Sequence, residues 1–549
     1  MKKKFFLLVE KIIKKVLSLN QQQKILFFFF FFLVFFGIIS SGLKYYYRYS
    51  KIVPKEGGVL KIGLIGEPQY VNPVLTRAND TDRFLIEVLY NGLFKIDGQG
   101  NLINDLASKI EISPDHKSYL VFLKENVFWH DGVPLTADDV VFTIETIQNK
   151  EYKSPLRDVW EGVVVEKISS SAVKFTLNQP YQPFLQNLTL KIIPKHIWEN
   201  ISAKSFPLTD YNIKPIGTGP FLFENLEKNK KGNIISYTLI RNENYFESRP
   251  YLSKIQFFFY NDYTGLKEGL LKGEVNMIAP VYPEDKEFFE KNNNFQLNRL
   301  SLYRYFAVFL NLDKEIFKNK NLREALELAI DKKVLKEEIL KGEAILVKNP
   351  FSLLNQEEEI NISNEYNPEK AKELIEGKEI EFTLSLPEDY QLIRVAQFLK
   401  KEWEKIGINV DLQILPIQEL EREVILTKNY EALLFGEIVN QSLDLFTFWH
   451  STQVGSYKLN LSNFRNKELD KLIEENWNKE EEKEQEIFQK GKEIFRTEKP
   501  AIFLYNPYYL YVTPKNLKGN NISLANLPFE LFSDVFLWHL KTERVLKIK

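Results

Sequence analysis

The sequence predicts an α/β protein of two lobes that follows one membrane-spanning helix at its N-terminus. The chain has 549 residues, more than one compact core usually holds. An uncharged apolar run occupies residues 25–43. Strand patterns then dominate to about residue 303, helices and strands alternate to about residue 505, and the last segment returns to strands. The strand patterns of the last segment predict that the C-terminal part of the chain belongs to the first lobe.

Composition places the chain among globular proteins and excludes several functions. Hydrophobic residues make up 44% of the chain and charged residues 27%. The net charge of −1 is unevenly spread, because residues 1–50 carry nine Lys or Arg and one Glu. The remaining body is acidic and gives no reason to expect nucleic-acid binding. The chain has no cysteine, which excludes disulfides, thiolate metal sites, cysteine nucleophiles and a lipid-modified cysteine.

The N-terminal segment has the features of a single-pass anchor. At helical rise, the apolar run of about 19 residues nearly covers the ~30 Å hydrocarbon core of a bilayer. Tyrosines 45–47 follow the run, where an interfacial aromatic belt is expected. Seven lysines precede the run, so the positive-inside rule places the N-terminus in the cytoplasm and the body outside. We therefore expect a basic cytoplasmic segment at 1–24, a transmembrane anchor at 25–43 and a linker at 44–56.

A cleaved signal peptide is the alternative interpretation of this segment. Ser40, Ser41 and Gly42 supply the small residues that a cleavage site needs. Cleavage near Gly42 would release a secreted body that begins at Leu43, which stands where a lipoprotein box has its cysteine. The N-terminal sequence of the mature protein distinguishes the two.

Individual elements follow from periodicity and capping signals. Thr136 and Asp139 match a capping box, so a helix is expected to begin there and to run to about residue 148. Other helices are expected at 83–93, 322–329, 334–340, 369–376, 393–406, 467–476 and 480–495. Strands are expected at 59–64, 93–96, 118–123, 408–415, 501–505 and 509–512.

A search for catalytic motifs gives no active site. The five histidines show no metal-ligand spacing, and nucleophile-elbow and phosphate-loop motifs are absent. We interpret the Gly-Thr-Gly-Pro run at 217–220 as a tight turn that enters a strand. His130-Asp131 and Asp138-Asp139 are interpreted as a turn followed by a helix cap. The sequence therefore predicts a binding protein rather than an enzyme, with no cofactor and no catalytic or metal-binding residues.

The body also carries a family signature. Residues 127–142, VFWHDGVPLTADDVVF, closely resemble the signature of family 5 extracellular solute-binding proteins. These are the dipeptide-, oligopeptide- and nickel-binding components of ABC importers. Further matches follow in order at 71–73, 89–93, 215–221, 241–246, 250–252, 311–331, 407–410 and 463–470. The likeness covers nearly all of residues 57–549.

The resemblance implies a periplasmic-binding-protein-like (Venus flytrap) α/β fold. By it, lobe I comprises residues 57–303 and 506–549, and lobe II comprises residues 304–505. The two crossing strands are expected near 305–310 and 502–505. A hinge motion then closes the lobes over a ligand.

The same resemblance implies where a ligand binds. In peptide-binding members, an acidic residue after a glycine-containing strand pairs with the amino terminus of the ligand. The matching stretch here is 434–446, and Ser442-Leu443-Asp444 stands where the family often has Asp-Pro-Asp. Asp444 is therefore the expected amine-binding residue, with Ser442 and Asn440 beside it. Which of Asp444 and Ser442 faces the ligand stays open.

Three further residues are candidates for the ligand site. Tyr90 and Asn91, in a lobe I loop, are candidates for the cleft wall. Trp449 is a candidate for stacking on the ligand, with a place in the core as its alternative.

The expected function is capture of short peptides of varied sequence in the interlobe cleft. The protein, as a monomer, then delivers them to an ABC permease and its ATPase, neither of which is in this chain. Three alternatives stay open. They are the same fold with a nickel chelate or another solute such as an oligosaccharide, a sensor or scaffold without transport, and a surface peptidase, which the missing catalytic residues argue against.

Overall fold

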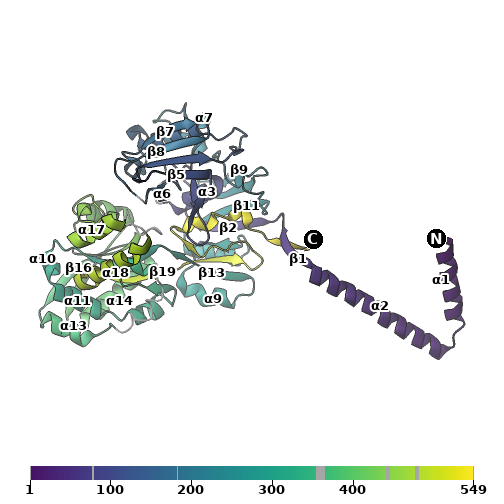
Figure 1. The fold of residues 1–549 in the computed structure, drawn as a ribbon. Helices are drawn as coiled ribbons and strands as arrows, with labels where there is room; N and C mark the ends of the chain where they lie inside the picture. The colour runs from purple at the N-terminus through teal and green to yellow at the C-terminus, as the bar shows by residue number, and fades with distance from the viewer. Residues whose placement is uncertain are drawn as a thin grey trace. The chain divides into compact units, whose positions relative to one another are not determined.

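The computed structural model describes residues 2–76, 79–181, 183–353, 365–439, 445–476 and 481–547. The chain divides into two compact units. The first consists of Met1–Glu56 with Lys541–Lys549, and the second of Gly57–Leu540. Figure 1 labels their helices and strands.

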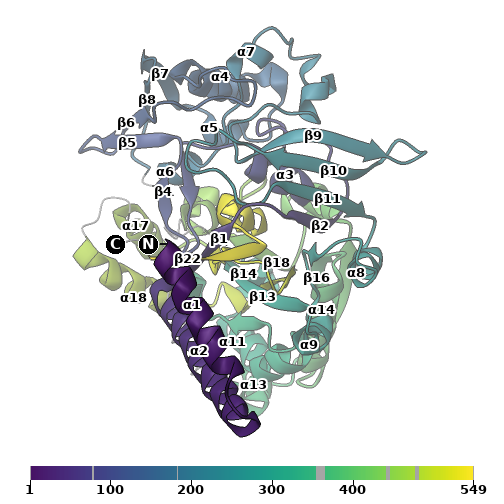
Figure 2. The same ribbon diagram turned by 90° about the vertical axis from the view of Figure 1, so that its right-hand side faces the viewer.

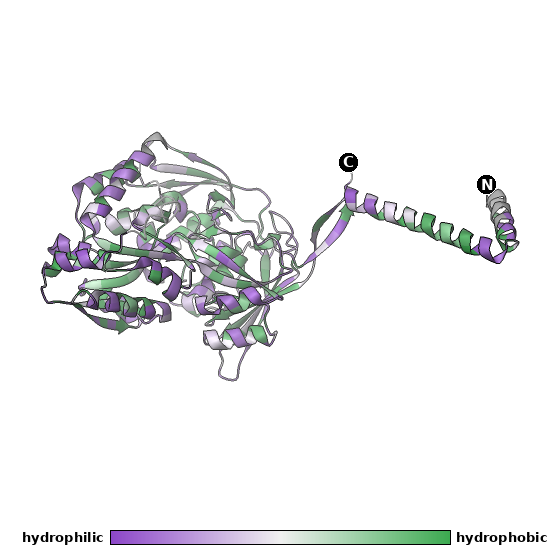
Figure 3. Ribbon diagram, turned by 90° about the horizontal axis from the view of Figure 1, so that it is seen from below, coloured by the Kyte–Doolittle hydropathy of each residue, from purple (hydrophilic) through white to green (hydrophobic). Residues whose placement is uncertain are grey.

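The first unit begins with two helices, α1 (Lys2–Leu17) and α2 (Gln21–Tyr49). Asn20 caps α2 by accepting a hydrogen bond from the backbone N–H of Gln23 at 2.9 Å. Helix α2 has 29 residues, which corresponds to a length of ~43 Å at ~1.5 Å per residue. Within the described part of the chain, α2 is the helix that is long and apolar enough to cross a membrane. Figure 3 shows the hydrophobic run along its middle.

Residues 44–56, expected to be a linker, are regular structure. They form the end of α2 and strand β1 (Ser50–Lys55), which pairs antiparallel with β22 (Lys541–Leu546). Lys55 and Glu543 form a diagonal ion pair across the two strands, with Nζ 3.2 Å from Oε2. The last strand of the chain, which was expected to return to lobe I, therefore pairs with the segment after α2. Most residues of the two strands are exposed or partly exposed, and charged side chains occur on both, which suits an exposed ribbon rather than a buried sheet.

The second unit contains a large eight-stranded sheet that corresponds to the expected lobe I. Its strand order is β21-β13-β20-β12-β2-β11-β10-β9. In that order, the strands are Leu524–Ala525, Phe295–Leu302, Tyr509–Pro514, Met277–Ile278, Val59–Ile65, Lys254–Tyr260, Ile234–Arg241 and Phe221–Lys228. Figure 2 shows β9, β10, β11 and β2 side by side. Strand β20 brings the late segment of the chain into this sheet beside β13.

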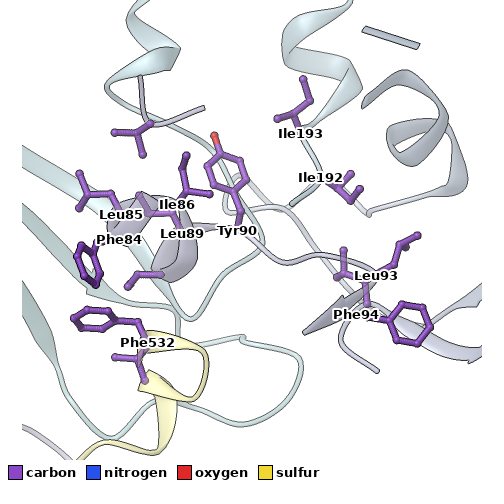
Figure 4. Close-up of a cluster of buried hydrophobic side chains, with 14 of the residues drawn as sticks. Phe84, Leu85, Ile86, Leu89, Tyr90, Leu93, Phe94, Ile192, Ile193 and Phe532 are labelled. Atoms are coloured by element: carbon purple, nitrogen blue, oxygen red, sulfur yellow. The ribbon is translucent and has the colours of Figure 1, made fainter. Parts of the chain in front are cut away.

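Lobe I also contains a four-stranded sheet and several helices. The sheet has the order β5-β6-β8-β7, with strands Ala107–Ile112, Ser118–Leu123, Ala172–Thr176 and Val164–Ser169. Two of the helices are α3 (Asp80–Leu89) and α4 (Ala137–Gln148). Helix α3 is buried along nearly its whole length, and its Phe84 ring meets Phe532 edge to face at 5.5 Å (Figure 4). This packing ties a helix near the start of the body to the C-terminal segment.

Lobe II is built on a six-stranded sheet with the order β15-β19-β14-β18-β16-β17. The strands are Ala344–Leu346, Ala501–Pro507, Arg304–Leu310, Ala432–Ile438, Ile380–Pro387 and Ile408–Leu415. One face packs against α11, α13 and α14 (Lys320–Leu328, Pro368–Ile375 and Tyr390–Glu404), and the other against α17 and α18 (Lys467–Asn476 and Glu481–Glu498). Along β14, Val308 and Leu310 enter the first core, whereas Tyr305 and Phe309 enter the second.

The chain crosses between the two large sheets at two single residues. Only Tyr303 separates β13 from β14, and only Tyr508 separates β19 from β20. Crossing strands were expected near 305–310 and 502–505, and β14 and β19 lie there. Two connections this short restrict relative motion of the lobes to a hinge about them.

An ion cluster lies beside these crossings. The Glu343 side chain is 1% exposed and accepts two hydrogen bonds from Arg299 of β13, at 2.7 and 2.8 Å. Lys286 Nζ lies 2.6 Å from Glu343 Oε1, and Glu290 accepts from Arg299 Nη2 at 2.7 Å. The backbone carbonyl of Glu343 accepts from the N–H of Tyr508 at 3.1 Å. We call Lys286, Glu290, Arg299 and Glu343 the hinge ion cluster.

Several expected elements are found, and others differ in their bounds. The strand at 408–415 and the helix at 467–476 are found with the predicted bounds. The predicted helix at 83–93 instead begins at Asp80 and ends at Leu89, because Asn79 caps its start. The capping box is present, with Asp139 accepting from the backbone N–H of Thr136 at 2.8 Å.

The signature segment fixes the glycine turn at 217–220. The backbone N–H of Gly217 donates to His130 Nδ1, and His130 Nε2 lies 3.1 Å from the carbonyl oxygen of Gly219. His130 thus accepts at one ring nitrogen and donates at the other, which requires the neutral imidazole. Gly219 in turn donates its N–H to the carbonyl of Leu89 at 2.9 Å. The turn does enter a strand, since β9 begins at Phe221.

Acid is expected to destabilise the protein through His130, whose hydrogen bonds hold the glycine turn. Burial lowers the pKa of His130 to about 4 from its ordinary 6.5, although the bond to Gly219 acts in the opposite sense. The unfolded chain therefore takes up a proton that the folded chain refuses, so stability falls as the pH drops from 6.5 to 4, by up to about 3 kcal/mol. Urea denaturation between pH 7.5 and pH 4.5 measures this loss. A His130→Gln variant is expected to lose less stability over that range, and equal losses in both proteins would contradict the prediction.

Candidate ligand-binding site

The loop after β18 contains the first group of predicted ligand residues. Asn440, Ser442 and Asp444 lie outside the residues that the structure describes, so their role stays a prediction. The structure does describe β18, the strand that leads to them. It pairs antiparallel with β14, and its last residue, Ile438, lies opposite Arg304. The N–H of Val439 then donates to the carbonyl of Tyr303, at the first crossing, at 2.8 Å. The loop therefore begins at the junction of the two lobes.

Tyr90 and Asn91 are buried at the end of α3, 0% and 4% exposed respectively. Asn91 Nδ2 donates to both carboxylate oxygens of Asp105, at 2.9 and 3.0 Å, and Asn91 Oδ1 accepts from the Thr218 hydroxyl at 3.1 Å. These bonds hold the glycine turn against α3. Figure 4 shows Tyr90 among apolar side chains, and burial raises the pKa of its hydroxyl. The structure gives both residues a packing role in lobe I, and their contact with a ligand stays a prediction.

Trp449 lies in the interior of lobe II, at the end of α16 (Phe446–Trp449), and is 1% exposed. Its ring packs against Phe495 at 4.8 Å and Phe503 at 5.8 Å. Its Nε1 donates to the hydroxyl of Tyr305 at 3.1 Å. The structure therefore places Trp449 in the core, which was the alternative interpretation. Its stacking on a ligand stays a prediction. Trp449 and the pair Tyr90–Asn91 thus belong to different lobes.

Glu437 closes the chain of hydrogen bonds that starts at Trp449. It is 2% exposed and accepts a hydrogen bond from the Tyr305 hydroxyl. Burial raises the pKa of Glu437 well above its ordinary 4.5, although the bond from Tyr305 and the charge of Lys428 act to lower it. Burial also lowers the pKa of Lys428, to about 8. Glu437 therefore holds its proton far above the pH at which an exposed glutamate loses it, so Glu437 is a weak candidate for binding an amine.

Arg304 is a cationic residue at the junction of the lobes, directly after Tyr303. As the first residue of β14, it lies on the same side of the strand as Phe306, with its guanidinium 5.8 Å from the centre of that ring. The Phe306 ring stacks on Tyr505 of β19 at 5.3 Å. Arg304 was not among the residues predicted from the sequence to bind a ligand. The sequence feature that could have marked it is a charged residue at the start of an otherwise apolar strand.

The arrangement suits holding a solute rather than transforming one. Within the described residues, no group of three or more His, Asp or Glu side chains is placed to hold a metal ion. What meets at the junction is a guanidinium, aromatic rings and the start of a polar loop. Such groups orient a small polar molecule through charge and hydrogen bonds.

Two lobes joined by two short crossings define the class of two-lobed solute-binding proteins. The model of "Bacterial extracellular solute-binding proteins, family 5 Middle" matches residues 101–457. The chain belongs to this family, as the signature at 127–142 implied.

Three relatives illustrate the likeness. Oligopeptide-binding protein AppA of Bacillus subtilis is 30% identical over 496 residues, which cover 85% of this chain and 89% of AppA. The solved structure of AppA in complex with a nonapeptide has a TM-score of 0.70 at 27% identity, covering 89% of this chain and 100% of that one. NikZ of Campylobacter jejuni, in complex with Ni(L-His), has a TM-score of 0.70 at 25% identity with the same coverage. The dipeptide-binding protein of Escherichia coli is 26% identical over 418 residues, which cover 66% of this chain and 76% of its own length. These relatives are binding proteins, and the chain is one too rather than an enzyme, as predicted.

Proposed function

We propose that the protein captures short peptides outside the cytoplasm and delivers them to the permease of an ABC importer. The observation that carries this proposal is the similarity to oligopeptide-binding AppA, 30% identical over 85% of the chain. The two single-residue crossings at Tyr303 and Tyr508 supply the hinge that closure over a ligand needs. The protein acts as a monomer, and its permease and ATPase are separate chains.

The proposed mechanism is capture by lobe closure. A peptide enters between the open lobes, and its ammonium group pairs with Asp444 in the loop after β18. Closure removes water from this pair, which strengthens the charge-assisted hydrogen bond. Contacts to the peptide backbone leave side chains free to vary, so specificity is broad.

Peptide binding by the full-length chain tests this function. The chain is extracted from membranes in mild detergent without refolding, and native mass spectrometry reports any ligand that co-purifies. Titration calorimetry with peptides of two to nine residues then gives affinities and the preferred length. Binding of at least one length supports the proposal, whereas binding of none contradicts it.

The Asp444→Ala variant tests the amine contact. Loss of one charge-assisted hydrogen bond is expected to weaken binding of the preferred peptide about 10- to 100-fold. N-terminal acetylation of that peptide is expected to weaken its binding to the parent protein, but to have little further effect on the variant. Asp158→Ala, at a side chain that is 90% exposed, is the matched control. Unchanged affinity in Asp444→Ala would remove Asp444 from the site.

A nickel chelate is the second candidate ligand, because the structure of NikZ with Ni(L-His) matches 89% of this chain. Titration with nickel and L-histidine under the same conditions decides between the two. Binding of this chelate together with failure of every peptide would favour the second candidate.

We further propose that α2 stays uncleaved and anchors the protein in the membrane, with its N-terminus in the cytoplasm. The length and composition of α2 and the seven lysines before its apolar run support this topology. The mature protein is expected to resist extraction by alkaline carbonate and to keep its original N-terminus. A mature N-terminus at Leu43 would instead show cleavage of a signal peptide.

A further inference from the structure

Helix α1 exposes an apolar stripe along one face. Phe6 is 78% exposed, Ile13 52% and Leu17 67%. Their spacings of seven and four residues are close to whole helical turns, so all three project from the same side of α1. Leaving such a stripe in water costs free energy, and exposed apolar surface of this kind marks a site of contact. The stripe therefore calls for a partner that covers it.

The side of α1 away from this stripe is basic. Lys11 and Lys15 lie opposite the stripe at 3.6 residues per turn, and both are exposed. Lys14 lies on the flank, with its Nζ 3.2 Å from Glu10 Oε1. The whole helix has six lysines and one glutamate, so it keeps a strong positive charge. The partner must therefore offer an apolar interior and a negative surface.

The short connection to α2 places α1 at the edge of the bilayer that α2 is proposed to cross. Only residues 18–20 separate the two helices. Asn20 has an extended backbone, with φ −71° and ψ 169°, and it caps α2, so α1 and α2 are separate helices (Figure 1). From Gln21 to Ile25, where the apolar run begins, α2 rises ~6 Å, about the thickness of one headgroup layer. Helix α1 therefore ends at the depth of the headgroups.

A membrane surface suits α1 better than a protein partner does. The lysines of a second copy of α1 would repel those of the first, whereas anionic headgroups attract them. A helix with one apolar and one lysine-rich face lies in the plane of a bilayer surface, with its apolar face at the boundary between headgroups and acyl chains. The flexible lysine side chains keep their ammonium groups among the phosphates.

We propose that α1 lies on the cytoplasmic leaflet as an interfacial helix and binds anionic lipid headgroups. This inference rests on the proposed membrane topology of α2 and deepens it, and it is independent of which solute the lobes bind. The protein then holds the membrane in two ways, through the hydrocarbon by α2 and along the inner surface by α1. Its attachment is stronger where the inner leaflet is more anionic.

Single cysteines report the depth of α1, because the chain has no cysteine of its own. The full-length chain with Ile13→Cys or Lys11→Cys is labelled with a polarity-sensitive fluorophore. It is then placed in nanodiscs of phosphatidylcholine alone or of an equimolar mixture with phosphatidylglycerol. In the mixed bilayer, the label at residue 13 is expected to shift its emission to the blue and to be quenched by brominated lipid. The label at residue 11 is expected to stay open to acrylamide, and the blue shift at residue 13 to shrink in the neutral bilayer.

Charge variants identify the contact with headgroups. In the Ile13→Cys chain, Lys15→Gln is expected to lower the ratio of docked to free α1 in the mixed bilayer about five-fold. Adding Lys11→Gln and Lys14→Gln is expected to lower the ratio further. Lys51→Gln removes an exposed lysine beyond the other end of α2, so this matched control is expected to leave the ratio unchanged.

The mass of the purified chain separates this inference from the proposed anchor. A mature chain without residues 1–42 would overturn both. An intact chain whose label at residue 13 stays open to acrylamide in both bilayers would overturn the inference alone. A label that is shielded from acrylamide yet not quenched by brominated lipid would also overturn it, by showing that α1 packs against protein. Equal docking in the neutral and mixed bilayers would overturn the binding of anionic headgroups.

Discussion

Replacing Gly217 with alanine is expected to destabilise the protein by more than about 4 kcal/mol, enough to prevent folding. A Cβ at this position would lie 1.8 Å from the carbonyl oxygen of Leu89. That oxygen belongs to the last residue of α3 and accepts the N–H of Gly219, so it cannot move without breaking the turn. The clash is therefore between two backbone segments, and no side-chain rotation relieves it. Urea denaturation and the yield of soluble protein measure the effect.

Gly265→Ala is the matched control. Gly265 lies in α8 (Tyr263–Leu271), where the nearest atom to a new Cβ is at 3.6 Å, an ordinary contact. Alanine is the better helix former, so this variant is expected to be as stable as the parent or more stable by up to about 1 kcal/mol. A Gly217→Ala protein as stable as the Gly265→Ala protein would show that the turn is not held as described.

The second large effect is expected from Glu343→Gln in the hinge ion cluster. The substitution keeps the shape of a side chain that is 1% exposed but removes the charge that Arg299 and Lys286 share. Arg299 then keeps only Glu290 as a counter-ion within the cluster, and Lys286 loses the carboxylate that lies 2.6 Å from its Nζ. Since both are partly solvated, the expected loss of stability is about 2–4 kcal/mol, towards the lower part of the range for broken buried ion pairs.

The same substitution has a pH signature. Burial acts to raise the pKa of Glu343, but hydrogen bonds from Arg299 and Lys286 outweigh it and hold the pKa below its ordinary 4.5. The contribution of Glu343 to stability is thus fully present above pH 4.5 and is lost as the pH falls below that value. The deficit of Glu343→Gln relative to the parent is therefore expected to shrink in acid. Glu287→Gln, at a side chain that is 80% exposed beside Lys291, is expected to leave the urea midpoint unchanged. A deficit in Glu343→Gln that is independent of pH would contradict the assignment.

The sequence predicted lobe II most closely, and the reason lies in local patterns. The helix at 467–476 has a strong amphipathic period, and the strand at 408–415 alternates between buried and exposed residues. The capping box at Thr136 is a contact between residues three apart, so it too is visible in the sequence. The crossings near Tyr303 and Tyr508 followed from the family resemblance rather than from any pattern.

Local sequence patterns could not predict contacts between residues that lie far apart in the chain. Ser50 pairs with Leu546, and no signal near either residue announces the other. The raised pKa of Glu437 depends on how deeply the fold buries its side chain, which composition does not reveal. Arg304 Nε is buried without a hydrogen-bond partner among the described residues, and this too depends on packing. The candidate site was therefore predictable as a place in the chain, at the loop after β18, but its charges and partners were not.

The pairing of β1 with β22 has a mechanical consequence. If α2 spans the membrane as proposed, the segment that follows it is a ribbon of two paired strands rather than a single extended chain. A pull on the body passes along the covalent chain of β1, while the ladder from Ser50–Leu546 to Lys55–Lys541 acts as a splint against bending. The N–H of Lys547 also donates to the carbonyl of Tyr49 at 2.7 Å, which brings the last described residue to the end of the anchor helix. If α2 is the anchor, the last strand of the chain is therefore held beside the end of the membrane-spanning helix.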